Sequence, residues 1–215
     1  MTTIIDTVEG LEFLHEHGIA IAPTRYVDGS EDAVFFASGR PIALRIATSA
    51  VSGAERSEAP PEAGLRTASE IRHAYDRLAP ARVIAQHQAE AGTNITIEGR
   101  DDEKIGRIVE LRCGAHAVHR LHPLSLDQAE VMLSEFRSKR GIAASEKAAR
   151  MLTHLLVRVS EVYEDESITQ VLLDPVRLHD NRYEVLDAAI WSKRALRLNP
   201  RLDKHARDKK SFYQP

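Results

Sequence analysis

The sequence predicts an α+β fold made of two small α/β units, the second with a largely antiparallel sheet. Three observations predict it. Helices and short strands alternate over the first 80 residues, short apolar strands follow one another over residues 82–121, and a long amphipathic helix and a hairpin close the chain. The length of 215 residues, with 43% hydrophobic and 28% charged residues, suits one domain or two small subdomains that share a core.

The first unit is expected to span residues 1–80. Asp6 or Thr7 can cap an opening helix that ends at Gly18. The elements expected after it are an extended piece at 19–22, a helix at 31–38 capped by Ser30, a strand at 41–46, and a helix from the capping box at 67–70 to about residue 78. Residues 49–64, rich in Ala, Ser, Glu, Gly and Pro, predict a long mobile loop within this unit.

The second unit is expected to span residues 81–192. Its expected elements are strands at 82–87, 94–98, 105–111 and 116–121, helices at 125–138 and 145–163, and a terminal hairpin. The helix at 145–163 carries apolar residues at helical spacing, which predicts a side that faces the core. Residues 193–215 form a basic tail, either solvated or in contact with an acidic or phosphate-rich partner.

Charge and cysteine content restrict the class of protein. The net charge of −3 gives no basic field for nucleic acid, so no nucleic-acid partner is expected. One cysteine, Cys113, excludes a disulfide framework within the chain and suits a reducing compartment. No run of 18 apolar residues and no signal peptide are visible, so we expect a cytoplasmic protein without a membrane span.

The terminal hairpin carries two carboxylates that its turn should bring together. Asp180-Asn181 is a favourable two-residue turn, and the register that it sets puts Asp174 directly opposite Asp187, with Cβ atoms roughly 5 Å apart. Like charges in such a pair destabilise a strand pair, and a cation between them removes that cost. Mg²⁺ is typically bound by one or two carboxylates and substrate phosphates. The alternative is a turn-flanking carboxylate beside a solvated one.

The order of these pieces resembles the ATP-grasp domain of the NDP-forming acyl-CoA synthetases, the acetyl-CoA and succinyl-CoA synthetase type. The resemblance runs from about Leu11 to Ile190, and it depends on the number, order and spacing of short motifs. The matching segments are 10–23 (opening helix and Gly-Ile-Pro-like strand), 30–34 (next helix start), 41–46 (phosphate-contacting strand), 83–86 (strand before the adenine hinge), 92–106 (hairpin), 121–129 (Ala-Pro-Leu-like turn and helix), and 173–176 with 185–188 (Mg²⁺-holding strands).

The resemblance implies a site for Mg²⁺ and ATP. Asp187 matches the metal-binding aspartate, and Asp174 stands where the family has a metal-binding asparagine. Arg45 stands at the family's phosphate-contacting lysine, which gives it a catalytic and nucleotide-binding role with a different donor geometry. The residues expected at the adenine hinge are Gln86, His87 and Gln88.

Several family positions are altered in this sequence. The family's His-Lys loop is replaced by residues 49–64, which contain no lysine, and acidic positions of the family are occupied by Asn94, Leu172 and His119. This sequence shows neither the CoA-binding nor the phosphohistidine domain, which full synthetases carry within the chain or receive from a partner. A partner subunit that carries them, in a homo- or hetero-oligomer, is one expectation from the resemblance.

Two functions remain open from the sequence, with an unrelated α+β binding module as a third. The first is a module or subunit of an acid–CoA ligase that binds Mg-ATP for phosphoryl transfer. The second is a non-catalytic ATP-grasp-like descendant that binds a partner or senses a nucleotide. The sequence alone leaves open whether this chain is an enzyme.

Overall fold

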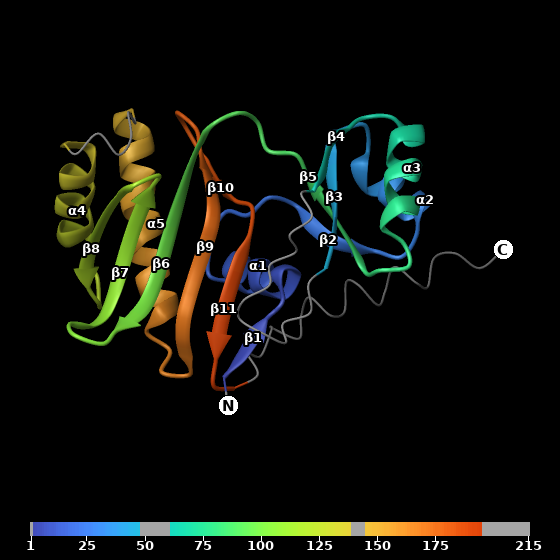
Figure 1. The fold of residues 1–215 in the computed structure, drawn as a ribbon. Coiled ribbons are helices and arrows are strands. Elements are labelled where there is room, and N and C mark those ends of the chain that lie inside the picture. Colours follow the sequence, from blue (N-terminus) through green and yellow to red (C-terminus); the bar gives the residue numbers. More distant parts are fainter. Residues whose placement is uncertain (1, 48–60, 139–144, 195–215) are drawn as a thin grey trace.

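The computed structural model describes residues 2–47, 61–138 and 145–194, and its strands form two separate sheets (Figure 1). The larger sheet has seven strands in the order β1-β11-β9-β6-β7-β8, with β10 paired to β9. All its strand pairs are antiparallel, which confirms the α+β class and the largely antiparallel sheet. Its strands are β1 (Thr3–Ile5), β6 (Thr93–Asp102), β7 (Gly106–Cys113), β8 (His116–Leu121), β9 (Ile168–Leu178), β10 (Tyr183–Val185) and β11 (Ala188–Ser192).

Helices cover one face of the larger sheet and form the main core with it. These helices are α1 (Thr7–Glu16), α4 (Leu126–Ser138) and α5 (Glu146–Tyr163). In Figure 1, α4 and α5 lie behind β6, β7 and β8. The predicted apolar side of α5 is buried: Leu152, Leu155 and Leu156 are inaccessible to solvent in a core that also contains Leu14 of α1 and Ile190 of β11. Most polar side chains of β6 and β7 lie on the opposite face, whereas Asp101 and Arg107 contact Tyr163 of α5 on the helix-covered face.

The smaller sheet has four strands in the order β2-β5-β3-β4, also antiparallel, with its own core. Its elements are β2 (Thr24–Val27), α2 (Ser30–Ala37), β3 (Ile42–Ile46), β4 (Glu62–Leu65), α3 (Ala68–Leu78) and β5 (Val83–His87). Both helices lie on the outer side of this sheet, to the right in Figure 1. Strand β3 buries Ile42 and Leu44, so Arg45 between Leu44 and Ile46 points to the opposite face of the sheet.

The helix starts predicted from capping residues are mostly confirmed. Asp6 accepts a hydrogen bond from the Glu9 N–H, and the capping box of Thr67 with Glu70 is complete. The capping pair of Ser125 and Gln128 is formed as well. Helix α2 differs, because its cap is Gly29 and Ser30 is its first helical residue.

Three strands were missed, and strands β6 and β9 are longer than predicted. Strands β1, β2 and β4 have three or four residues each, too short for a clear alternation. The predicted loop at 49–64 is wrong at its end, where residue 62 begins β4, and most of the remainder lies outside the described residues. The segment between the strands predicted at 94–98 and 105–111 is also partly strand. Strand β6 continues to Asp102, which pairs with Gly106 of β7, and Arg100 within it forms ion pairs with Asp102 and Glu110.

The elements of the two sheets are not contiguous in the sequence. Strand β1 pairs with β11 at the other end of the chain, and α1 packs against β11, although both precede residue 80. Strand β5 follows residue 80 but belongs to the smaller sheet. Sheet membership thus differs from the expected boundary at 80/81, and the division into subdomains stays a prediction. The basic tail lies outside the described residues except for residues 193 and 194. No helix in the described ranges is both long enough and apolar enough to cross a bilayer.

His122 lies just beyond the end of β8, within hydrogen-bond distance of Ser160 in α5. The Ser160 hydroxyl accepts the Leu124 N–H at 2.8 Å, so it can donate its own proton to His122 Nδ1 at 3.0 Å, which requires a neutral imidazole. Burial, and secondarily the nearby charge of Arg107, lowers the pKa of His122. The neutral form is therefore favoured in the folded state.

We expect the free energy of unfolding to decline as the pH falls below about 6.5, the unfolded histidine's pKa. Above that pH, His122 is neutral in both the folded and the unfolded state, so its titration does not change the free energy of unfolding. Between that pH and the lower pKa of His122 in the folded state, only the unfolded state binds the proton, and the free energy of unfolding therefore falls. Urea unfolding at pH 7.5 and pH 5.5 should show a smaller decline for His122→Gln than for the wild type. Equal declines in the wild type and in His122→Gln would show that His122 does not cause the pH dependence.

Candidate functional site

The predicted register of the terminal hairpin is confirmed. The loop contains Asp180 and Asn181, and β9 pairs with β10 and then with β11 in one continuous register on either side of the two aspartates. At the aspartates themselves, the Asp174 N–H donates to the Asp187 carbonyl at 3.0 Å. The Leu186 N–H donates to the Pro175 carbonyl at the same distance. Asp174 and Asp187 therefore face each other across the strand pair.

Both oxygens of the Asp187 carboxylate have protein donors. Oδ1 accepts the Thr7 hydroxyl at 2.9 Å and the Ala188 N–H at 2.8 Å. Oδ2 accepts Nη1 of Arg45 at 3.0 Å. A carboxylate oxygen has two lone pairs, so Oδ1 is fully used and Oδ2 can accept one more partner. Oδ2 is thus the oxygen that can bind a further ligand.

Asp174 is held by the neighbouring strand. The Thr96 hydroxyl on β6 donates to its Oδ1 at 3.1 Å. Thr96 lies between the buried Ile95 and Ile97, so its side chain is on the sheet face opposite the helices. The carboxylate of Asp174 reaches this same face, which also carries Glu98 and Arg100 of β6.

Arg45 joins the two sheets at Asp187. Its side chain projects from β3 of the smaller sheet, and the arginine and aspartate side chains are 22% and 17% exposed. Its Nε and Nη2 atoms are buried and have no hydrogen-bond partner among the described residues. These two atoms share the edge of the guanidinium that binds an oxyanion through two parallel hydrogen bonds. The arginine thus contacts Asp187 with one nitrogen, and its Nε–Nη2 edge could still bind an anion.

The three predicted hinge residues have different surroundings. Gln86 Nε2 donates to the Leu186 carbonyl at 2.7 Å and to the Thr24 hydroxyl at 2.8 Å, so Gln86 also links the two sheets. His87, next on β5, contacts the carbonyl of Phe36 in α2 at 3.1 Å. The Gln88 N–H donates to the Pro41 carbonyl at 2.9 Å. The structure thus brings Gln86 and Arg45 to the segment that carries Asp187 and turns His87 away from it. Their nucleotide contacts stay a prediction.

Sequence reasoning missed Thr7 and Thr96 as partners of the two aspartates. The sequence marks Thr7 only as a candidate cap for the opening helix, and Thr96 only as part of a strand. Thr7 and Asp187 are 180 residues apart in the sequence, and Thr96 and Asp174 are 78 apart. No local signal connects such residues.

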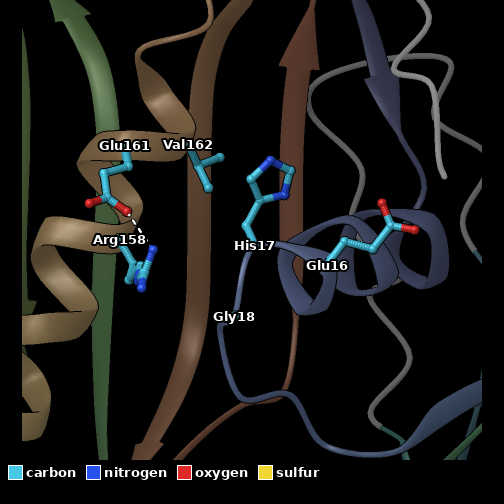
Figure 2. A pocket seen from close by; sticks show the side chains of 6 residues that line it. All are labelled: Glu16, His17, Gly18, Arg158, Glu161 and Val162. Atoms are coloured by element: carbon cyan, nitrogen blue, oxygen red, sulfur yellow. Dashed lines mark hydrogen bonds and ion pairs between the residues drawn. The ribbon is translucent and has the colours of Figure 1, made fainter.

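A hollow of about 430 Å³ lies elsewhere, between the C-terminal end of α1 and α5 (Figure 2). Its lining residues are Glu16, His17, Gly18, Arg158, Glu161 and Val162. It lies at the opposite end of α1 from Thr7, roughly 14 Å along the helix at 1.5 Å per residue. None of the predicted site residues lines it. Within the described ranges, no group of three or more His, Cys, Asp or Glu side chains is placed to hold a metal ion.

Comparison with known proteins gives similar sequences and similar folds. The chain is 26% identical over 202 residues to the ADP-forming acetate–CoA ligase II of Archaeoglobus fulgidus; the match covers 85% of the chain but spans only 29% of that protein. Among solved structures, ACD1 of Ca. Korarchaeum cryptofilum in complex with coenzyme A has a TM-score of 0.78 at 22% identity, covering 89% of this chain and 94% of that one.

A second structure of the dinucleotide-forming acetyl-coenzyme A synthetase 1 of Ca. Korarchaeum cryptofilum, in complex with coenzyme A and Mg-AMPPCP, has a TM-score of 0.73 at 24% identity. That match covers 89% of this chain and 93% of that one. The family described as "ATP-grasp domain" matches residues 1–191, nearly the whole chain. Since this match covers far more than half of the chain, this protein, with its two sheets joined by the Arg45–Asp187 ion pair, belongs to the ATP-grasp domain family.

Proposed function

We propose that this chain binds Mg-ATP between its two sheets and serves as the nucleotide-binding module or subunit of an acid–CoA ligase. The observation that carries the proposal is the buried, unpartnered Nε–Nη2 edge of Arg45 beside Asp187. A guanidinium edge of this kind suits a phosphate group, and burial strengthens its interaction with an anion. A phosphate is thus the ligand that would satisfy these donors.

The donor set on the other sheet fits Mg²⁺. Asp174 and Asp187 provide carboxylate oxygens from facing positions, and Oδ2 of Asp187 can accept another partner. Mg²⁺ takes few protein ligands in nucleotide sites and fills its shell with phosphate oxygens and water. Bound there, the ion would neutralise charge on the phosphates. Arg45 would orient the phosphoryl group and offset the charge that builds up on it during transfer, which is largely electrostatic work.

The names of the matched enzymes suggest the class of reaction in which this chain would take part. One is named as an ADP-forming acetate–CoA ligase, and another was solved with Mg-AMPPCP and with its phosphohistidine segment pointing towards the nucleotide-binding site. By analogy, the phosphoryl group would leave ATP here and be received by a partner that also binds CoA. The chain's own contribution is then to bind the nucleotide and to exclude water from the transferred group.

A non-catalytic, nucleotide-sensing descendant is the second candidate. The Arg45–Asp187 ion pair favours it, because an arginine already neutralises the aspartate without a metal. The altered family positions Asn94, Leu172 and His119 favour it too. Both candidates predict nucleotide binding, whereas only the first predicts phosphoryl transfer to a partner.

Calorimetric titration with ATP, with Mg²⁺ and with EDTA, tests the proposal on the full chain. We expect ATP to bind much more tightly with Mg²⁺ than in EDTA, and we expect the Asp174→Ala/Asp187→Ala double variant to lose that gain. Circular dichroism and thermal unfolding should first show that this variant is folded. No heat of binding at millimolar ATP from folded wild type would contradict nucleotide binding. Binding without phosphoryl transfer to a CoA-binding partner would favour the sensor.

A further inference from the structure

The hydroxyl of Thr7 has no role in starting its own helix. Asp6 is the cap of α1 and accepts the Glu9 N–H at 3.0 Å. The Thr7 hydroxyl instead donates to Asp187 Oδ1, at the other end of the chain. Since Asp6 already caps the helix, the interaction that the Thr7 hydroxyl makes is its hydrogen bond to the Asp187 carboxylate.

That hydrogen bond helps to fix the orientation of the Asp187 carboxylate. The Thr7 hydroxyl and the Ala188 N–H together use both lone pairs of Oδ1. Rotation of the carboxylate would break both bonds at once. Oδ2 is consequently the oxygen that lies toward Arg45 and the smaller sheet.

Thr96 makes the same kind of contact with the opposite aspartate. Its hydroxyl donates to Oδ1 of Asp174 from the neighbouring strand, on the sheet face away from the helices. Each of the two facing carboxylates therefore has one threonine hydroxyl on its Oδ1 atom. The two threonines come from different elements, α1 and β6, both outside the hairpin that carries the aspartates.

We propose that Thr7 and Thr96 are positioning residues that orient the carboxylates of Asp187 and Asp174 toward a shared divalent cation. The inference rests on the proposed Mg-ATP site and deepens it. Hydrogen bonds from outside the coordination shell fix ligand orientation, and their loss typically costs about 10- to 100-fold in metal affinity. A hydroxyl that acts through a carboxylate should affect Mg²⁺ and leave metal-free nucleotide binding unchanged.

The test compares valine and serine at each threonine. Valine keeps the shape of threonine and loses the hydroxyl, whereas serine keeps the hydroxyl. The readout is the apparent Mg²⁺ dissociation constant at fixed ATP, measured beside ATP binding in EDTA and beside the melting temperature. Thr169→Val is the matched control, because the Thr169 hydroxyl donates to the Trp191 carbonyl within the same sheet and contacts neither aspartate.

We expect Thr7→Val and Thr96→Val each to raise the Mg²⁺ dissociation constant about tenfold, with serine at either position near wild type. ATP binding in EDTA and the Thr169→Val control should not change. If ATP binding by the wild type depends on Mg²⁺ but both valine variants keep the wild-type Mg²⁺ dissociation constant, this inference alone is overturned. Equal losses for valine and serine would also overturn it, because the serine hydroxyl is retained. If ATP binding by the wild type does not depend on Mg²⁺, the proposed function and this inference are overturned together.

Discussion

Asp187→Asn is expected to weaken Mg²⁺-dependent ATP binding by about 30-fold or more, and Asp174→Asn by less than about tenfold. Truncating one partner of a buried, hydrogen-bonded charge pair costs about 2 to 5 kcal/mol, and 1.4 kcal/mol corresponds to a factor of ten. For Asp187 the partner in such a pair is the proposed cation, because its Oδ1 is saturated and its Oδ2 can accept a further ligand. Asp174 stands where the resembling family has asparagine, so an amide oxygen should serve there.

Calorimetry at fixed Mg²⁺ measures this ranking. Asp102→Asn is the control for a change of net charge, since Asp102 lies at the end of β6 and pairs with Arg100. Its affinity for Mg-ATP should equal that of the wild type. Equal affinities for the wild type and both hairpin variants would rule out the two aspartates as ligands.

Arg45→Met should lower both ATP affinity and stability. The substitution removes the guanidinium edge that is proposed to bind phosphate, and it leaves Asp187 without its cation. Breaking a fully buried ion pair costs about 3 to 5 kcal/mol, and both side chains here are about one-fifth exposed, so we expect about 2 kcal/mol. Arg45→Lys should retain more ATP affinity than Arg45→Met, because lysine keeps the charge and loses only the paired donors.

A double-mutant cycle separates the ion pair from other effects of the substitution. The variant with both Arg45→Met and Asp187→Asn should be less destabilised than the two single variants together, with a coupling of about 1 to 2 kcal/mol in urea unfolding. Arg25→Met is the matched control, because Arg25 of β2 pairs with Asp32 of α2, away from Asp187, and is 41% exposed. Additive losses for Arg45 and Asp187 would contradict their interaction in solution.

The two measurements on Arg45 also distinguish the candidate functions. A large loss of stability with unchanged ATP affinity would describe a structural ion pair that has replaced a metal, as in a non-catalytic descendant. A loss of ATP affinity larger than the loss for Asp174→Asn would favour the phosphate-binding role. Gln86 should contribute to the same junction, because its side chain also contacts the larger sheet at Leu186.

The sequence by itself determined those features that depend on neighbouring residues. The Asp180-Asn181 turn sets the hairpin register, and that register brings Asp174 opposite Asp187. Helix α5 follows from an apolar period within 18 residues, and α3 from a capping box within four. In each case the chemistry that selects the structure lies within a short segment.

Only the tertiary structure decided what the aspartates contact. The ion pair of Asp187 with Arg45 joins residues 142 apart in the sequence, and its hydrogen bond to Thr7 joins residues 180 apart. The pairing of β1 with β11 likewise joins the two ends of the described chain. Turn chemistry and hydrophobic period act over a few residues, whereas these contacts depend on how two sheets and a helix pack. No single segment carries that information, because the packing is a property of all the surfaces that meet.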